Sequence, residues 1–300
     1  MRALASLSML VLSGCSMVLG IDDPKARDDG GVPPVDVGPP SDHLVFSLTD
    51  FTFAQGQMVR LHVTFVHKDG PMDDVTMDPK LMLMSSNDAF ATIGGKGQIN
   101  GGSQAGSATI TASYAGAAPA TLKATTTTTV CHPVINELMT GTTTSGADEF
   151  VEIYNPCATT IDVNNWTLVY RGSNTTGGQD ANALSTLNGQ MAPGELRLYA
   201  GTAYTGAGVH DGTFAMSTGL AAAGGAVGLR AGPKDTGPLV DSIAYGAVMA
   251  ANPFIELNAI AALTDGKTAS RKLFDGNDTD NNGADFAVPT TPTPRALNIP

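Results

Sequence analysis

Residues 149–156, EFVEIYNP, decide the fold class of this chain. In an extended chain, Val151 and Ile153 lie on one side, and Glu152 and Tyr154 lie on the other. A period of two residues is typical of a β-strand that packs one face into a core. The stretch therefore predicts a strand within a packed sheet.

The same alternation recurs on both sides of this stretch. Apolar and polar residues alternate in 59–66, 108–114 and 166–170, and runs of Gly, Ser and Asn between them mark turns. The composition agrees, because 35 Gly, 18 Pro and only 15% charged residues suit short strands and are poor material for long helices. With 42% hydrophobic residues, the chain has enough apolar area for real cores. These features predict an all-β protein.

The charge balance argues against a nucleic-acid partner. The chain has 28 acidic and only 16 basic residues, which gives a formal net charge of −12. Phosphate backbones are bound by clusters of Lys and Arg, and the few basic residues here are spread along the chain. We therefore expect no binding to nucleic acid.

The first fifteen residues have the order of a bacterial export signal. Arg2 precedes an apolar stretch at 3–12, which is too short to span a bilayer as a mature helix. Leu12-Ser13-Gly14-Cys15 follows and resembles the lipobox of bacterial lipoproteins. That resemblance implies cleavage before Cys15 and lipidation of the Cys15 thiol. The alternative is an ordinary signal peptide with an incidental cysteine.

Residues after the lipobox predict an anchored spacer. Ser16 stands where an Asp would indicate inner-membrane retention, so the sorting rule of the lipoprotein family implies the outer membrane. Residues 20–41 contain acidic residues, Gly-Gly and Pro-Pro without apolar periodicity, which indicates a disordered linker. We assign 1–14 to a lipoprotein signal peptide and 15–42 to the linker. The chain is thus expected in the cell envelope, held to the membrane by its lipid.

Residues 43–127 resemble a known bacterial surface module. SSN at 85–87, ATI at 91–93 and AGSATITA at 105–112 are similar to the group 2 bacterial immunoglobulin-like domain. The sequence departs from that family at Leu83, where the family usually has Trp. The resemblance implies a β-sandwich that serves as a spacer or adhesion element and has no catalytic residues.

Residues 131–300 resemble a second immunoglobulin-like module. VINEL at 134–138, EFVEIYNP and WTL at 166–168, followed by DTDNN at 278–282, are similar to the lamin tail domain. Together, the two resemblances imply two tandem immunoglobulin-like β-sandwiches after the signal peptide and the disordered linker.

Two cysteines are left when Cys15 is assigned to the lipid. Cys131 and Cys157 form an even pair in an oxidising compartment, which favours a disulfide. The bridge would close a loop of about 27 residues and contribute about 3.5 kcal/mol by chain entropy. The alternative is two buried thiols.

Several acidic residues are candidates for chemistry. Glu137 and Glu152 invite an interpretation as paired catalytic carboxylates, but acids in solvent or in a structural hydrogen bond are the simpler explanation. Asp278, Asp280 and Asn282 match the first half of a calcium loop.

The calcium pattern is incomplete. Pro289 occupies the twelfth position of the loop, where a bidentate carboxylate is required. Asp275 and Asp285 could still contribute to a looser site, although a hydrogen-bonded turn is favoured. We assign no metal, cofactor or catalytic residue from the sequence.

The sequence therefore predicts a non-enzymatic surface lipoprotein that acts as a structural, adhesion or binding module, with a protein or a glycan as ligand. An alternative is an accessory subunit that docks an exported hydrolase, because lamin tail domains often adjoin nucleases and phosphatases. A third hypothesis is a hydrolase that uses Glu137, Glu152 or the Asp275–Asp285 cluster.

Overall fold

The computed structural model describes residues 41–175, 180, 182–206, 209–215, 219–272, 276 and 278–298. The chain divides into residues 1–40 and 41–300, and the described residues belong to the second unit. The signal peptide, Cys15 and all but the end of the assigned linker lie outside the described residues.

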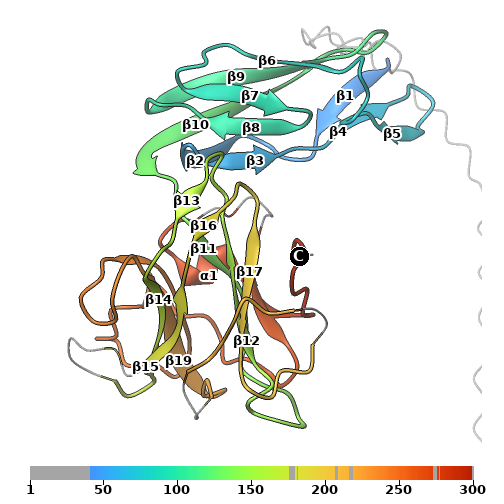
Figure 1. Cartoon of the computed structure of the whole chain (residues 1–300). Coiled ribbons are helices and arrows are strands. Elements are labelled where there is room, and N and C mark those ends of the chain that lie inside the picture. Colours follow the sequence, from blue (N-terminus) through green and yellow to red (C-terminus); the bar gives the residue numbers. More distant parts are fainter. Residues whose placement is uncertain are drawn as a thin grey trace, which may run out of the picture. The chain divides into compact units, whose positions relative to one another are not determined.

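The all-β prediction is confirmed. The described residues form strands β1 to β22 and a single turn of helix, α1 (Asn282–Asp285), as Figure 1 shows. Within the part of the chain described here, no helix has both the length and the apolar character needed to cross a bilayer.

The first group of strands forms two layers around one hydrophobic core. One layer has the strand order β2-β10-β9-β6, and the other combines β1-β4-β5 with β3-β8-β7. Alternate residues of β9 face this core. Ala108, Ile110 and Ala112 are buried, whereas Thr109 lies on the other face and is exposed. Leu83 also packs against this core. The strands are β1 (His43–Phe46), β2 (Phe51–Gln55), β3 (Met58–Arg60), β4 (Val63–Val66), β5 (Met72–Asp74), β6 (Met82–Ser85), β7 (Ala91–Gly95), β8 (Gln98–Gly101), β9 (Gly106–Ser113) and β10 (Ala120–Val130).

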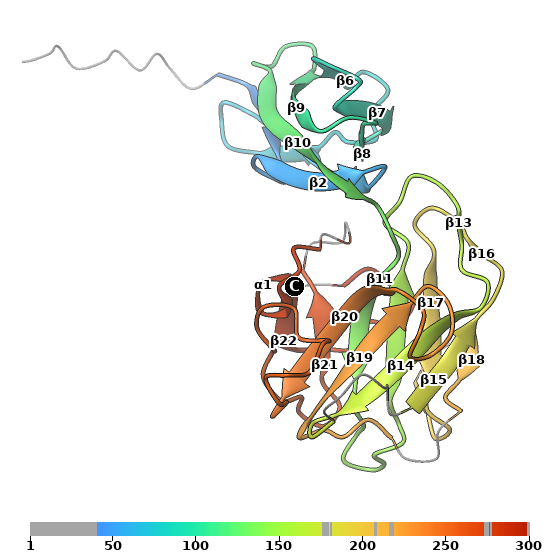
Figure 2. The same cartoon turned by 90° about the vertical axis from the view of Figure 1, so that its left-hand side faces the viewer.

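The second group of strands encloses a separate core. Its two main sheets have the orders β18-β17-β12-β11-β21-β22 and β15-β14-β19-β20, and a short pair β13-β16 completes it (Figure 2). The strands are β11 (Val134–Met139), β12 (Phe150–Tyr154), β13 (Ile161–Asp162), β14 (Trp166–Gly172), β15 (Asn182–Leu187), β16 (Gln190–Met191), β17 (Leu196–Ala200), β18 (Gly212–Thr213), β19 (Gly224–Arg230), β20 (Leu239–Gly246), β21 (Thr268–Arg271) and β22 (Phe286–Thr290).

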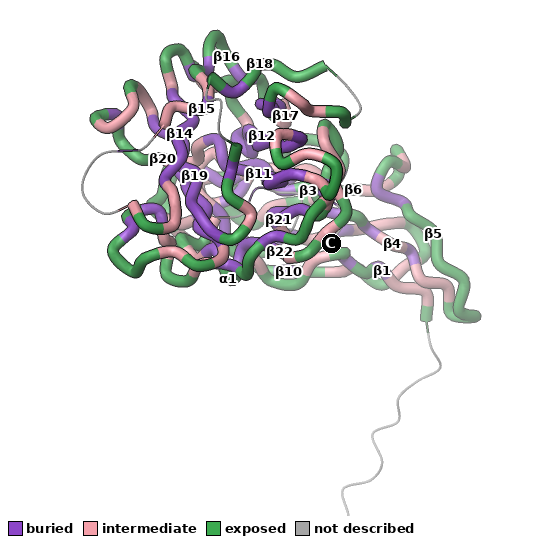
Figure 3. The backbone as a smooth tube through the Cα atoms, turned by 90° about the horizontal axis from the view of Figure 1, so that it is seen from below, coloured by how far each residue is buried: buried purple, intermediate pink, exposed green. Residues whose placement is uncertain are grey.

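The residues that decided the fold class lie in this second core. Val151 and Ile153 of β12 are fully buried between the two main sheets, and Leu168 of β14 faces them from the other sheet. Glu152 and Tyr154 point to the opposite face of β12, but they are buried too. Figure 3 shows the central strands of this sandwich as almost continuously buried. Both faces of the six-stranded sheet are therefore covered.

A β-bulge in β11 sets the position of the acidic pair. Ile135 pairs with Ile153, but the next pair is Glu137 with Glu152, so Asn136 is an extra residue in β11. A bulge shifts the alternation by one residue, so that Ile135 and Leu138 both face the core while Glu137 faces away from it. This shift brings the two glutamates to the same face of the sheet.

Candidate functional site

Glu137 and Glu152 lie directly opposite each other on β11 and β12, and both have an exposed fraction of 0%. Directly opposed residues of an antiparallel pair bring their side chains close together on one face. The two candidate carboxylates are thus neighbours on one face of the sheet, and neither is accessible to solvent.

Hydrogen bonds occupy the Glu137 carboxylate. The hydroxyl groups of Thr268 and Ser270 on β21 donate to Oε1 at 2.8 and 3.1 Å. The backbone N–H of Thr293 donates to Oε1 and Oε2 at 3.0 and 3.2 Å. The Glu137 side chain therefore links the sheet to the chain segment that follows β22.

Glu152 binds the same segment. Its Oε2 accepts the backbone N–H of Arg295 at 2.5 Å, and its Oε1 accepts the side-chain amide of Asn136 at 2.9 Å. The Asn298 amide group adds bonds to the carbonyl oxygens of Asn136 and Arg271 at 3.1 and 2.9 Å. Residues 293–298, which we name the C-terminal strap, thus cover both glutamates.

Burial changes the acidity of the pair. Burial raises the pKa of Glu152 to about 7, and the hydrogen bonds from Arg295 and Asn136 oppose that rise. Burial also raises the pKa of Glu137, against the hydrogen bonds that it accepts. A raised pKa suits a general acid, but a general acid must reach its substrate, and the strap leaves neither carboxyl exposed. The geometry fits a structural polar network under the strap.

A second acidic cluster surrounds Arg271, which sequence reasoning did not single out. The Arg271 guanidinium is fully buried and pairs with Asp241 of β20 at 2.9 Å. Asp278 and Asp285 lie 3.6 Å from the same guanidinium. The group also stacks over the Phe286 ring, with its central carbon 4.6 Å from the ring centre. One cation thus lies close to two buried acids, Asp241 and Asp285, and to the partly buried Asp278.

Among the described residues, one group of acids has the spacing of metal ligands. It consists of Asp241, Glu256 and Asp278, whose carboxylate oxygens lie within 4.8 Å of one another. Burial and the neighbouring carboxylates raise the pKa of Glu256 to about 9. The Glu256 oxygens already accept bonds from Ser242 and Asn282. The contacts present fit a structural cluster in which Arg271 and a proton bound to Glu256 offset part of the negative charge.

The residues of the incomplete calcium motif do not converge. Asp280 is exposed, whereas the Asn282 amide is buried and bonds Ser242 and Ala244 of β20. Asp278 accepts the backbone N–H of Asp280, as in a turn. Asp285 accepts both the backbone N–H and the hydroxyl of Thr279, and Asp275 lies outside the described residues. The segment is a hydrogen-bonded turn.

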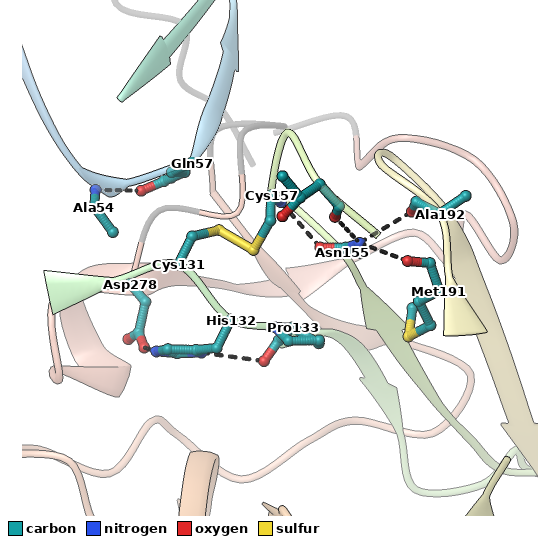
Figure 4. The surroundings of a disulfide bond; sticks show 11 residues. Ala54, Gln57, Cys131, His132, Pro133, Asn155, Cys157, Met191, Ala192 and Asp278 are labelled. Atoms are coloured by element: carbon teal, nitrogen blue, oxygen red, sulfur yellow. Dashed lines mark hydrogen bonds and ion pairs between the residues drawn. A yellow bond between two sulfur atoms is a disulfide. The ribbon is translucent and has the colours of Figure 1, made fainter. Parts of the chain in front are cut away.

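The structure joins Cys131 and Cys157 in a disulfide with a Cα–Cα distance of 5.6 Å (Figure 4). Asn155 organises the turn before Cys157, because its side-chain oxygen accepts the Cys157 N–H at 3.0 Å and its amide donates to Met191 and Ala192. The Cys131 N–H donates to the carbonyl of Gln55 at 2.9 Å. The bridge therefore lies where the end of β10 meets both this turn and the end of β2.

A cavity of about 590 Å³ lies beside the disulfide. Its lining includes Phe51 and Phe53 of β2, Thr127 of β10, His132 and Asp278. The phenylalanines form an apolar wall, and most of the other lining residues are polar. Cavities that combine apolar walls with polar groups are common sites of ligand binding.

No model of a known protein family matches this chain, and no curated protein matches it. Among solved structures, the chain is similar to a DUF4876 family protein from Bacteroides thetaiotaomicron, at 12% identity and a TM-score of 0.44, over 86% of this chain and 98% of that one.

Two structures of the S-layer protein SbsC also match. Domains 5–6 match at 14% identity and a TM-score of 0.27, over 69% of this chain and 97% of theirs. Domains 4–9 match at 15% identity and a TM-score of 0.28, over 69% of this chain and 31% of theirs. These likenesses do not assign the chain to a family. The resemblances to the group 2 bacterial immunoglobulin-like domain and the lamin tail domain stay predictions.

Proposed function

We propose that this chain is a lipid-anchored protein of the bacterial cell envelope that acts as a structural or binding module and performs no catalysis. The observation that carries the proposal is the burial of the paired glutamates. Glu137 and Glu152 are the paired acids of the hydrolase hypothesis, and both are fully buried and hydrogen-bonded under the C-terminal strap.

Two features that involve cysteine support the proposed location: the disulfide and the lipobox sequence. Disulfides persist in oxidising compartments such as the periplasm and the cell surface, and the Cys131–Cys157 bridge fits such a compartment. The Leu12–Cys15 sequence supplies the proposed anchor. Several acyl chains on one cysteine give the stable membrane attachment that a single chain does not.

The proposed ligand is a protein or a glycan bound through loops, a sheet edge or the cavity beside the disulfide. Loops and sheet edges on rigid β-scaffolds commonly carry binding function. Protease treatment of intact cells tests whether the folded part is accessible from outside. Capture from detergent-solubilised membranes then identifies the ligand: retained glycan or structural protein supports the proposal, and a stoichiometric enzyme would instead indicate a docking subunit.

Catalysis is tested directly with the purified protein. We expect no activity in broad esterase, nuclease and glycosidase screens, with or without calcium. A hydrolytic activity that disappears in Glu152→Gln, or a calcium-dependent one that disappears in Asp280→Ala, would contradict the proposal. A matched control is Glu195→Gln, because Glu195 lies in a turn outside both acidic clusters.

A further inference from the structure

Strand β6 forms an open edge of the sheet β2-β10-β9-β6. Its register with β9 pairs Met84 with Thr111, and the Ser86 N–H donates to the Thr109 carbonyl at 3.0 Å. In an antiparallel ladder only every second residue bonds to a given neighbour. Even-numbered residues of this strand therefore bond β9, and Leu83 and Ser85 direct their backbone N–H and C=O groups away from it.

These outward groups have no partner among the described residues. The backbone hydrogen bonds in this part of the chain run to β9 or lie within the adjoining turns, and none involves the backbone groups of Leu83 or Ser85. An unpaired strand edge is a template for another strand. The β6 edge can thus accept a further strand without losing any bond that it already makes.

The side chains of β6 do not protect this edge. Met82 and Met84 are 61% and 59% exposed, and the strand itself has no charged residue. Proteins usually guard open edges with charges. The contrasting edge strand β5 is guarded in this way, because it carries Asp73 and Asp74.

We propose that β6 pairs with β6 of a second copy of this chain, antiparallel and across a two-fold axis at Met84. In this register Leu83 faces Ser85 of the second copy, and each pair exchanges two N–H···O bonds. The two Met84 residues then form a non-hydrogen-bonded pair, the type in which side chains come closest. The two-fold axis closes the assembly at two copies.

Charge complementarity favours a second copy as the occupant. The same register brings the turn that holds Lys80, just before β6, near the turn that holds Asp88 of the second copy, just after its β6. Attraction therefore acts at both ends of the paired strands. Two chains with a net charge of −12 repel each other over most of their surface, so pairing requires an edge without acidic residues, and β6 offers one.

Cysteine cross-linking tests this register in the full chain. In Met84→Cys the two new thiols face each other with a Cα–Cα distance of about 4.5 Å, which lies in the range that a disulfide spans. In the control Met82→Cys, each new thiol faces Ser86 of the second copy, and the two thiols are about 13 Å apart. Under mild oxidation we expect at least tenfold more reducible dimer from Met84→Cys.

Three results would overturn the proposal: equal dimer yields from the two variants, no dimer from Met84→Cys, or cross-linking of Met84→Cys to a different protein. Both side chains are exposed, so neither variant should disturb folding, and an intact Cys131–Cys157 bridge verifies this.

A charge swap tests the register independently. Lys80→Glu in the Met84→Cys chain should lower the dimer yield severalfold at low salt, and adding Asp88→Lys should restore it. A yield that Lys80→Glu leaves unchanged, or that Asp88→Lys fails to restore, contradicts the two-fold arrangement.

Discussion

Arg271 and Asp241 form an ion pair in which both side chains are fully buried, and Arg271 Nη2 donates to both carboxylate oxygens, at 3.1 and 2.9 Å. The guanidinium also donates from Nε to the Ile135 carbonyl on β11. One side chain thus connects β21 to both β20 and β11. Its loss would leave the buried Asp241 and Asp285 without their common cation.

We therefore expect Arg271→Met to destabilise the protein by about 4 kcal/mol, because an uncompensated buried charge costs far more than a surface pair. Urea denaturation measures the change. The control Lys267→Met removes a cation at a turn and should change the free energy of unfolding by less than about 0.5 kcal/mol. Equal effects of the two substitutions would contradict the role of Arg271.

Buried carboxyls make the stability of the fold depend on pH in an unusual direction. Burial raises the pKa of Glu149 and of Glu152 to about 7, above the ordinary value of 4.5 that applies when the chain is unfolded. Between these values the folded state binds more protons than the unfolded state, so stability falls as pH rises. Each group contributes at most about 3 kcal/mol to this fall.

We expect a higher thermal midpoint at pH 5 than at pH 8. Glu149→Gln should flatten the profile, because the amide resembles the protonated acid and its oxygen can still accept the Leu220 N–H that Glu149 binds at 2.6 Å. Calorimetry across pH 5–8 measures both. A midpoint that rises with pH over this window would show that these carboxyls are not held protonated.

The disulfide should contribute about 3.5 kcal/mol to the free energy of unfolding, because it lowers the conformational entropy of the unfolded chain. The double variant Cys131→Ser/Cys157→Ser is expected to lose that amount in guanidinium denaturation. Alkylation of the denatured chain without reductant, mapped by mass spectrometry, should modify neither cysteine. Reactive thiols at both positions would instead support the alternative of two buried free cysteines.

The C-terminal strap depends on Asn298, whose amide is buried and donates to Asn136 and Arg271. We expect Asn298→Ala to cost about 2 kcal/mol, because it leaves buried carbonyl oxygens without donors. The adjacent Leu297 is 45% exposed, so Leu297→Ala is a matched control that should change stability little. Faster proteolysis of the strap in Asn298→Ala, but not in Leu297→Ala, would support the conclusion that Asn298 holds the strap against the sheet.

Local alternation was enough to predict the all-β class. The period of Val151 and Ile153 depends only on neighbouring residues, and the structure places both in the second core as that period requires. The burial of Glu152 could not be predicted this way, because the residues that cover it come from the strap, 143 positions later in the chain. A two-residue period indicates that a side chain faces away from one core, but not what covers it.

The acidic sites show the same limit. The bulge at Asn136 moves Glu137 to the face of Glu152, and nothing in the alternation of 134–138 indicates the extra residue. Asp241 and Arg271 are 30 positions apart and meet only because β20 and β21 lie in facing sheets. The missing carboxylate at position 289 favoured a turn over a calcium loop at 278–282, but the sequence did not indicate that Asn282 bonds β20.

Membrane release by Cys15→Ser is the most direct test of the proposed envelope anchoring. The unchanged chain should incorporate radiolabelled palmitate and sediment with the membrane fraction. The Cys15→Ser chain should incorporate none and should leave that fraction, while its Cys131–Cys157 bridge still forms. If the Cys15→Ser chain stayed with membranes as firmly as the unchanged chain, it would contradict a lipid anchor at Cys15.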